Sequence, residues 1–318
     1  MNTAFSDAGA AAFMDWLADG DGDGRDWSAE VLENPGGERP VVGYACHATT
    51  SEGMAGGLRR VVAKTYGDDL GATAFAAMTT LHAAVAAAGA TTLRIPRPLR
   101  YDAQRRCLLQ ERAAGCSLGT LLGSAELPQA MSVAGRALAE LHGLAVDGSR
   151  AKTLAEHIGE LMRPHPEDLA LAFPEYRLRI EAILAALARA LPNDVPPVPL
   201  HRDFHPRQIF IDGGHGWIID WDLYAHGDPA LDVGNFLMSM RLKRLPAVAA
   251  AAFLHGYAQV RDDPQMRRRV WAYGALNYLR RACKHWRLRH ADAPRLIAGM
   301  LAAAEDEIQL NRAQGGKA

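Results

Sequence analysis

Residues 201–208 of the chain read His-Arg-Asp-Phe-His-Pro-Arg-Gln, and residues 218–221 read Ile-Ile-Asp-Trp. The stretch that joins the two motifs consists of two short apolar runs separated by Asp-Gly-Gly. A glycine-containing turn between two apolar runs is typical of a β-hairpin. The pattern therefore predicts that Asp203 follows the end of a strand, and that Gln208 and Asp220 lie at the two ends of one hairpin.

These three side chains suit one kind of chemistry. Phosphoryl transfer needs a carboxylate that orients the attacking hydroxyl, metal ligands that bridge the phosphates, and a cation on the leaving oxygens. Asp203 can act as that carboxylate, and Gln208 and Asp220 can offer oxygen ligands to Mg²⁺. Lys64, alone among apolar residues of a predicted strand, would supply the cation. The alternative for Lys64 is a solvated lysine on an alternating strand.

The sequence on the two sides of residue 112 differs in character. Before it, strands are expected at residues 41–44 and 60–66, with a Gly-rich reversal between them and an Ala-rich helix over 72–88. After it, the sequence is mostly helical, apart from a strand at 198–200 and the hairpin. The expected helices are 128–144, 151–162, 174–190, 229–241, 246–260, 265–288 and 293–312.

Composition excludes several classes of protein. The 318 residues include 35 Lys and Arg against 36 Asp and Glu, a balance that disfavours general binding to nucleic acid or to a membrane surface. The four cysteines form no Cys-x-x-Cys pair, so neither a disulfide framework nor a zinc site is indicated. No basic region leads into an apolar run at the N-terminus, and Thr79, Thr80 and His82 interrupt the Ala-rich segment. We expect a cytoplasmic protein, and the sequence indicates no oligomeric state.

Taken together, the motifs resemble a known family. The active-site block of the aminoglycoside phosphotransferase and choline kinase family is similar to His-x-Asp-x-His-Pro-x-Gln at 201–208, Ile-Asp-Trp at 219–221 and Gly-Asp-Pro-Ala-x-Asp at 227–232. Supporting similarities, in the right order, are Val-Ala-Lys at 62–64, Ile-Pro-Arg-Pro at 95–98, Leu-Leu-Gln-Glu-Arg-Ala-Ala-Gly at 108–115 and Ala-Leu-Ala-Glu-Leu-His at 137–142. The resemblance covers roughly residues 40–290.

The resemblance implies an α+β, protein-kinase-like two-lobed fold. It has a small N-lobe with an antiparallel sheet and a larger, mainly helical C-lobe. The expected boundaries are an N-terminal helical extension over residues 1–36, an N-lobe over 37–111 and a C-lobe over 112–318.

The resemblance also implies an ATP-dependent phosphotransferase that transfers the γ-phosphoryl group to a hydroxyl of a small molecule. Asp203 would be the catalytic base, Gln208 and Asp220 the Mg²⁺ ligands, and Lys64 the phosphate-binding lysine. The remaining roles follow in the same way: Gln110, Glu111 and Arg112 would hold the adenine of ATP, and Asp228 and Asp232 would brace the catalytic loop. The histidines of the 201–208 motif are expected to pack the loop rather than carry protons.

The chain departs from the family pattern at two functional positions. The family has Asn where this chain has Gln208, whose carbonyl oxygen sits on a stem one methylene longer. The helix expected over 72–88 contains no acid that could pair with Lys64, which leaves Asp68 and Asp69 just before it as substitutes. These departures motivate an alternative function, a catalytically silent nucleotide-binding pseudokinase scaffold. A protein kinase is disfavoured because Ile-Asp-Trp replaces Asp-Phe-Gly.

A second metal motif lies near the N-terminus. Residues 19–30 satisfy the EF-hand pattern Asp-x-Asp-x-Asp-Gly-x₅-Glu, which would bind calcium. Asp26 stands at the eighth loop position, which is normally apolar, and only a short helical piece is expected before the Asn-Pro-Gly-Gly stop at 34–37. A solvated acidic turn is the alternative.

The charge of the C-terminal part bears on the acceptor. Residues 241–295 contain thirteen Lys or Arg and three Asp, and Arg280, Arg281, Lys284 and Arg287 recur at the spacing of one helix face. Such a face is commonly only solvated, but a basic lobe disfavours a polycationic acceptor such as an aminoglycoside. We expect an anionic or neutral small molecule instead.

Overall fold

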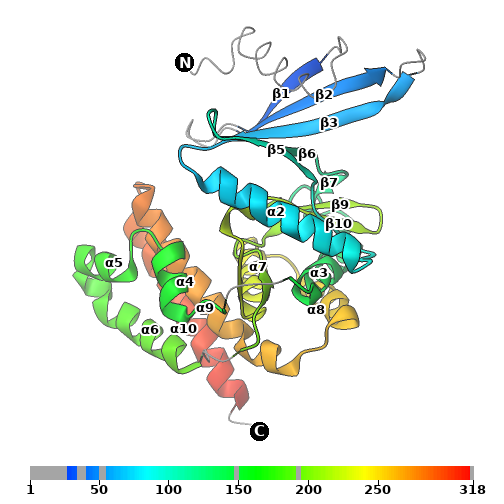
Figure 1. Cartoon of the computed structure of the whole chain (residues 1–318). Coiled ribbons are helices and arrows are strands. Elements are labelled where there is room, and N and C mark those ends of the chain that lie inside the picture. The colour runs from blue at the N-terminus through cyan, green and yellow to red at the C-terminus, as the bar shows by residue number, and fades with distance from the viewer. Residues whose placement is uncertain (1–26, 34–40, 50–54, 147–149, 191–194, 316–318) are drawn as a thin grey trace. The chain divides into compact units, whose positions relative to one another are not determined.

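The computed structural model describes residues 27–33, 41–49, 55–146, 150–190 and 195–315 (Figure 1). The chain divides into two compact units. The first comprises residues up to 82 together with 96–113, and the second comprises 83–95 and 114–318.

The first unit is built on a five-stranded antiparallel sheet. The strand order is β1-β2-β3-β6-β5. The strands are β1 (Trp27–Glu33), β2 (Val41–Thr49), β3 (Ala55–Thr65), β5 (Pro98–Asp102) and β6 (Cys107–Glu111). The alternation of side chains along each strand decides which residues share a face.

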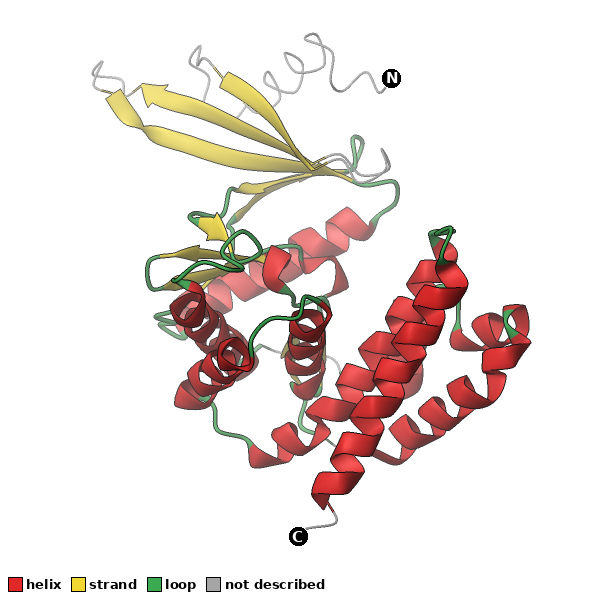
Figure 2. Ribbon diagram, turned by 180° about the vertical axis from the view of Figure 1, so that it is seen from behind, coloured by secondary structure: helices red, strands yellow, loops and turns green. Residues whose placement is uncertain are grey.

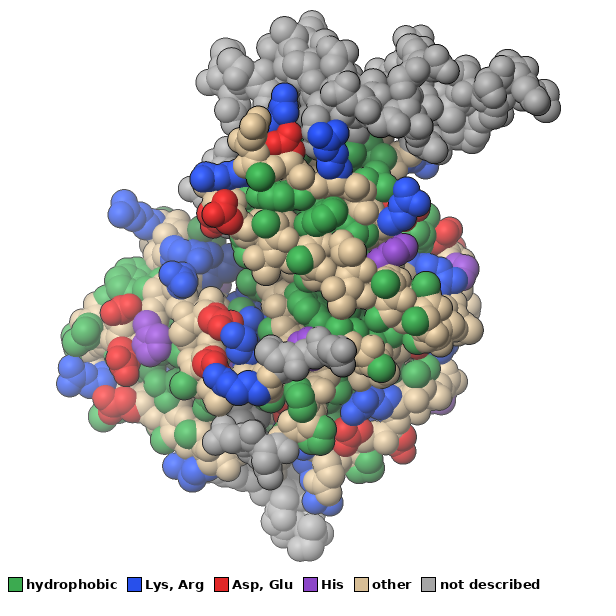
Figure 3. Space-filling view, viewed as in Figure 1, with side chains coloured by type: hydrophobic (Ala, Val, Ile, Leu, Met, Phe, Trp, Pro, Cys, Tyr) green, Lys and Arg blue, Asp and Glu red, His purple; other side chains and the backbone are tan. Residues whose placement is uncertain are grey.

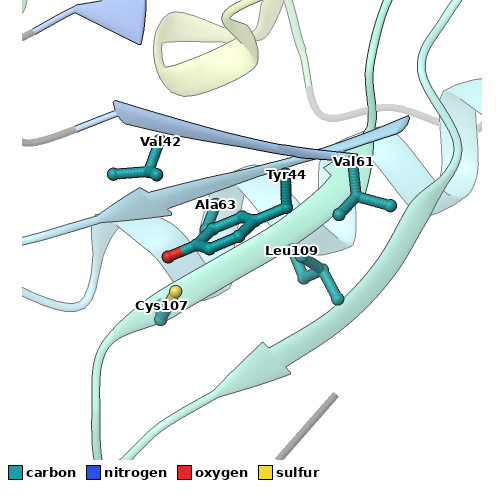
Figure 4. Packing of buried hydrophobic residues seen from close by; sticks show 6 residues of the cluster. All are labelled: Val42, Tyr44, Val61, Ala63, Cys107 and Leu109. Carbon is teal, nitrogen blue, oxygen red and sulfur yellow. The ribbon is translucent and has the colours of Figure 1, made fainter. Parts of the chain in front are cut away.

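One face of this sheet carries the hydrophobic core of the unit. Its buried side chains come from three neighbouring strands and point toward one another (Figure 4). They are Val42, Tyr44, Val61, Ala63, Cys107 and Leu109. The residues between them in sequence therefore project from the opposite face.

Helix α2 (Leu70–Ala87) follows β3 on that opposite side. The ring of Phe75 stacks on that of Tyr101 in β5 with 6.5 Å between centroids. Among the described helices α2 is the one long and apolar enough to cross a membrane by length and composition. Its Ala74, Met78 and Leu81 are buried within the protein, as in a helix that covers a core.

The second unit contains the predicted hairpin. Strands β9 (Ile209–Asp212) and β10 (His215–Ile218) pair antiparallel, with Ile209 opposite Ile218. Short strands β4 (Leu93–Arg94) and β7 (Cys116–Ser117) complete the sheet order β4-β10-β9-β7. A separate antiparallel pair joins β8 (Val198–Leu200) to β11 (Ala225–Gly227).

Helices make up most of the second unit (Figure 2). Helix α3 packs closely on α8, because Gly135 and Gly256 have no side chain to separate the two backbones. The long helices α9 and α10 lie side by side in both views. The helices are α3 (Leu127–Gly143), α4 (Leu154–Leu161), α5 (Pro166–Ala172), α6 (Arg177–Ala190), α7 (Ala230–Leu242), α8 (Ala247–Val260), α9 (Pro264–Arg287) and α10 (Ala293–Gly315).

Two local predictions are corrected by the structure. The short helical piece expected before residue 34 is instead strand β1, whose backbone pairs with β2. An EF-hand needs a helix at the end of its loop, so strand geometry over Trp27–Glu33 contradicts the calcium-binding interpretation. The rest of that loop, and residues 1–26 of the expected N-terminal helical extension, lie outside the described residues. Helix α5 was not predicted; it is only seven residues long and begins at a proline.

Candidate functional site

The hairpin brings Gln208 and Asp220 into contact, as the sequence predicted for its two ends. The backbone N–H of Ile219 donates to the carbonyl of Gln208 at 3.0 Å, which extends the β9–β10 ladder by one pair. Beyond that pair, Nε2 of Gln208 donates to Oδ2 of Asp220 at 2.8 Å. The stem of Gln208 is therefore long enough to reach the carboxylate across the open end of the hairpin.

The separation of these two side chains fits a shared magnesium ion. Two neighbouring ligands of octahedral Mg²⁺ at 2.0–2.1 Å lie about 2.9 Å apart. Rotating the Gln208 amide by 180° would place its oxygen where its nitrogen now lies, 2.8 Å from Oδ2 of Asp220. No group of three or more His, Cys, Asp or Glu among the described residues is arranged to hold a metal. Phosphate and water oxygens would therefore have to complete the coordination.

Asp203 comes shortly after the end of β8, as the sequence predicted for a residue that follows a strand. Its carboxylate is 31% exposed and reaches solvent. Its Oδ1 lies 3.3 Å from Nη1 of Arg280 in α9, and its Oδ2 lies 3.7 Å from Nε2 of His205. Burial lowers the pKa of His205, although the charge of Asp203 acts in the opposite direction. Near neutral pH the imidazole is therefore neutral, and Arg280 is the cation that contacts Asp203.

His201 connects Asp203 to the end of the hairpin where Asp220 lies. The imidazole is fully buried, and its Nε2 lies 2.7 Å from the carbonyl oxygen of Ile219, to which it donates. Nδ1 is then the acceptor for the backbone N–H of Asp203, at 3.3 Å. One ring thus links the backbone of Asp203 to the residue before Asp220, and both of its nitrogens take part in these contacts.

Asp232 holds the loop that carries Asp203 through hydrogen bonds to its backbone. This side chain in α7 is completely buried, and its two oxygens accept the backbone N–H groups of His201 at 2.8 Å and Arg202 at 2.7 Å. Burial favours the neutral acid, but the hydrogen bonds that Asp232 accepts from the His142 ring and from the backbone N–H of His201 outweigh it and lower the pKa of Asp232. The ionised carboxylate therefore acts as a brace, the role that the resemblance implied.

A buried chain of hydrogen bonds extends this brace to a neighbouring helix. His142, at the end of α3, lies 3.2 Å through Nε2 from Oδ2 of Asp232 and 2.8 Å through Nδ1 from the hydroxyl of Tyr257 in α8. Burial lowers the pKa of His142 and raises that of Tyr257, so both groups are neutral. The Tyr257 hydroxyl then donates to His142, which donates to Asp232.

Asp228 supports the start of α7 in the same way. Its Oδ1 accepts the backbone N–H of Ala230 at 3.0 Å and Nη2 of Arg269 at 3.0 Å. A second bond joins Nε of Arg269 to Oδ2, so the pair is bidentate. Both aspartates of the 227–232 motif thus form hydrogen bonds that hold the protein's own backbone and side chains in place.

Two residues of the site have a left-handed backbone. Arg202 has φ 65° and Asp220 has φ 68°, a region that costs a residue with a side chain on the order of 1–2 kcal/mol. The brace from Asp232 holds the first of them, because it accepts the N–H of Arg202 itself. Such strain gathers at functional sites, where it aims a side chain.

Two further contacts of the loop were not predicted from the sequence. Arg280 donates to the carbonyl of Arg202 at 3.2 Å as well as facing Asp203. The buried guanidinium of Arg202 is held by Glu160 of α4, with 2.8 Å between Nη1 and Oε2. The helical spacing of Arg280 with its neighbours was a signal for the first contact. Nothing in the sequence pointed to Glu160.

The predicted nucleotide-binding residues lie in the first unit. Lys64 in β3 is paired with Leu108, which is also opposite Tyr101, so these three share the face toward α2. The Lys64 ammonium lies 5.1 Å from the ring centroid of Tyr66. No acid occurs in α2, whereas Asp68 caps the helix through the N–H of Leu70 at 3.2 Å.

The segment predicted to hold adenine has part of its backbone already bonded. The N–H of Glu111 donates to the carbonyl of Arg97 at 2.9 Å, and that of Arg112 donates to the carbonyl of Arg60 at 3.0 Å. Gln110 is buried within β6. These two backbone N–H groups are therefore already used within the protein.

Comparison with known proteins identifies the family. A family model described as the phosphotransferase enzyme family matches residues 49–269. The chain belongs to this family. The match covers β3, the catalytic loop, the hairpin and most of the helices that brace them. No curated protein matches the chain.

Solved structures show the fold of this phosphotransferase family member to be α+β and protein-kinase-like, as predicted. A choline/ethanolamine kinase family protein from Mesorhizobium loti is 18% identical, with a TM-score of 0.60 and 88% of each chain covered. A macrolide 2′-phosphotransferase from Brachybacterium faecium is 20% identical, with a TM-score of 0.58, covering 91% of this chain and 97% of that one. An amicoumacin kinase, solved in complex with AMP-PNP, Ca²⁺ and Ami, is 15% identical, with a TM-score of 0.61 and 88% of each chain covered.

Proposed function

We propose that the chain is an ATP-dependent phosphotransferase that transfers the γ-phosphoryl group to a hydroxyl of a small molecule in the cytoplasm. The observation that carries the proposal is the contact between Gln208 and Asp220, whose 2.8 Å separation suits one Mg²⁺ ion. Membership of the phosphotransferase family supports the reaction class. The amicoumacin kinase was solved with an ATP analogue and a divalent cation, which supports the choice of cofactors.

In the proposed reaction Asp203 acts on the acceptor. Its carboxylate accepts the hydrogen bond of the hydroxyl and aims the oxygen at the γ-phosphorus. The new bond joins the acceptor oxygen to phosphorus, and the bond from phosphorus to the β–γ bridging oxygen breaks. ADP leaves with that electron pair, and the hydroxyl proton passes to Asp203 and then to solvent. The bond from Arg280 fixes one carboxylate oxygen and leaves the other for the hydroxyl.

The metal ion would be held by Oε1 of Gln208 and a carboxylate oxygen of Asp220. When bound, Mg²⁺ neutralises charge on the phosphate oxygens. The His201 ring sets the distance between this pair and Asp203, because it bonds to the backbone on both sides. Lys64 is proposed to contact phosphate oxygens, and the segment from Gln110 to Arg112 to hold the adenine.

The test is release of ADP from Mg²⁺-ATP with pooled hydroxyl compounds. The wild type is compared with Asp203→Asn, which keeps the shape of the side chain and removes its charge. A matched control is Asp262→Asn, an exposed aspartate of the second unit, 63% exposed and paired with Arg267. We expect Asp203→Asn to lower kcat at least ~100-fold and the control to match the wild type.

Two outcomes would contradict the proposal. Equal ADP release by the wild type and Asp203→Asn would remove Asp203 from the reaction. Binding of ATP with no turnover on any pool would favour the alternative function, a silent scaffold in which the Gln208 amide stays bonded to Asp220 instead of turning its oxygen to a metal.

A further inference from the structure

The C-terminal half of α9 carries a row of cations beside the catalytic loop. Arg280, Arg281, Lys284 and Arg287 follow one another at one-, three- and three-residue intervals, so they lie on neighbouring positions of the helix surface. Figure 3 shows Lys and Arg side chains gathered over the region where the upper end of α9 lies in Figure 1. All four belong to the second unit, as does Asp203.

Among these four cations, Arg280 is the one whose side chain has bonding partners in the described part of the protein. Arg280 is bonded to the carboxylate of Asp203 and to the carbonyl of Arg202. Within the described part of the chain, the side chains of Arg281 and Lys284 make no hydrogen bond and no ion pair. Asp203 is the carboxylate whose charge acts most strongly on each of them.

The other carboxylates near this end of α9 are occupied. Glu160 is shared between Arg202 at 2.8 Å and Lys152 at 2.6 Å. Asp168, whose charge reaches Cys283 in α9, accepts the backbone N–H of His165 at 3.1 Å and so caps α5. The row therefore keeps an excess of positive charge, because Glu160 is paired with Arg202 and Lys152 and Asp168 is hydrogen-bonded to the backbone of α5.

Arg281 and Lys284 have also lost part of their hydration. Burial lowers the pKa of Arg281, and the charge of Arg280 beside it acts in the same direction. The Lys284 side chain reaches solvent, yet the protein atoms around it withdraw enough water to lower its pKa as well. A cation that has lost part of its hydration and has no bonded anion in the protein is stabilised most by a ligand that carries an anionic group.

We infer that Arg281 and Lys284 form a binding site for an anionic group of the acceptor, so that the natural acceptor is a hydroxyl compound that carries a phosphate or a carboxylate. The inference rests on the proposed function and deepens it. The planar guanidinium of Arg281 suits bidentate contact with either group, and Lys284, three residues on, adds a second charge to the same anion. An acceptor with several ammonium groups would meet repulsion at the same place.

Binding of simple anions tests the site without turnover. The full chain is titrated with inorganic phosphate and, separately, with acetate in the presence of Mg²⁺-AMP-PNP, by isothermal titration calorimetry. Arg281→Gln and Lys284→Gln are each expected to weaken binding of the preferred anion at least ~10-fold, as for loss of a charged hydrogen bond. Arg281→Lys, which keeps the charge, should fall between. Equal affinity in the wild type and Arg281→Gln would overturn the inference.

A matched control comes from the other end of the same helix. Arg267 is an exposed arginine paired with Asp262, fourteen residues and hence about 21 Å from Arg281 along α9. Arg267→Gln removes the same charge from the molecule and is expected to bind phosphate and acetate within about 2-fold of the wild type. A loss equal to that of Arg281→Gln would show that only net charge matters and would reject the site.

Turnover then separates this inference from the proposed function. ADP release is measured with glycerol, glycerate, glycerol 3-phosphate and kanamycin as acceptors. We expect kcat/KM at least ~10-fold higher for an anionic member than for glycerol, and Arg281→Gln to remove that preference through KM for the acceptor while KM for ATP stays within about 2-fold. Turnover that depends on Asp203 but favours glycerol or kanamycin would reject the anion site and leave the proposed function standing. ADP release with none of them would count against the proposed function, and the anion titrations would still decide the site.

Discussion

Replacing Asp232 with Asn isolates the buried brace under the catalytic loop. Asn has the same shape as Asp but only one acceptor oxygen. In the structure Oδ1 accepts the N–H of Arg202, and Oδ2 accepts the N–H of His201 and that of the His142 ring. Whichever way the amide is placed, its NH₂ group faces one of the two backbone donors, so one buried N–H loses its acceptor.

The magnitude follows from those contacts. A buried donor without a partner costs about 1–3 kcal/mol, and the hydrogen bonds that remain weaken from charge-assisted to neutral by about 1 kcal/mol in total. We therefore expect Asp232→Asn to lower the free energy of unfolding by about 3 kcal/mol. Because total stabilities are typically 5–15 kcal/mol, the variant should still fold and can be assayed. The left-handed backbone of Arg202 would relax, and the resulting shift of Asp203 should lower kcat at least ~10-fold.

Urea unfolding followed by circular dichroism measures the first effect, and ADP release the second. The surface variant Asp262→Asn is the matched control, and it should change the free energy of unfolding by less than about 0.5 kcal/mol because its ion pair with Arg267 is exposed. A loss below about 1 kcal/mol in Asp232→Asn, or an unchanged kcat in a destabilised variant, would refute the brace.

Three further predictions concern other parts of the second unit. Gly115→Ala should lower the free energy of unfolding in urea by about 3–4 kcal/mol, because Gly115 has φ 79° and a Cβ there would overlap the carbonyl of Ile211. Gly213→Ala should cost about 1 kcal/mol, because Gly213 has φ 57° but open space around it. Equal costs for the two substitutions would contradict this prediction. Burial lowers the pKa of His157 to about 4, below the value of about 6.5 in the unfolded chain, so the free energy of unfolding that depends on this residue is present above pH 6.5 and is lost as the pH falls toward 4. His157→Phe should reduce this acid-induced loss of unfolding free energy by up to about 3 kcal/mol. An unchanged slope of unfolding free energy against pH would contradict the prediction. Gln208→Ala should raise the Mg²⁺ concentration for half-maximal ADP release at least ~10-fold, and an unchanged Mg²⁺ dependence would exclude Gln208 as a ligand.

The sequence predicted most of the architecture because its signals were local. The hairpin could be read from two apolar runs and a glycine turn, and the long helices from their periodicity, with ends that differ from the structure by a few residues. The same reasoning failed at Trp27–Glu33, which forms β1 by pairing with β2 across a stretch of sequence that gives no local sign of it. Helix α5 was too short to show a period.

The site was predictable only where a motif carried it. The positions of Asp203, Gln208 and Asp220 followed from spacing, and contact between the last two required only the hairpin. The ion pair between Arg280 and Asp203 joins residues 77 positions apart. The sequence therefore indicated a basic helix face but not the acid that it contacts. The bond between Glu160 and Arg202 depends on where α4 packs, which no pattern of residues in the sequence encodes.

Anomalous diffraction from crystals grown with Mn²⁺ and AMP-PNP would test directly whether the end of the hairpin is a metal site for phosphoryl transfer. We expect a manganese peak at about 2.1 Å from both an oxygen of Asp220 and the side-chain oxygen of Gln208, with the amide turned from its present bond. A peak bound elsewhere, with the Gln208 amide nitrogen still donating to Asp220, would contradict it.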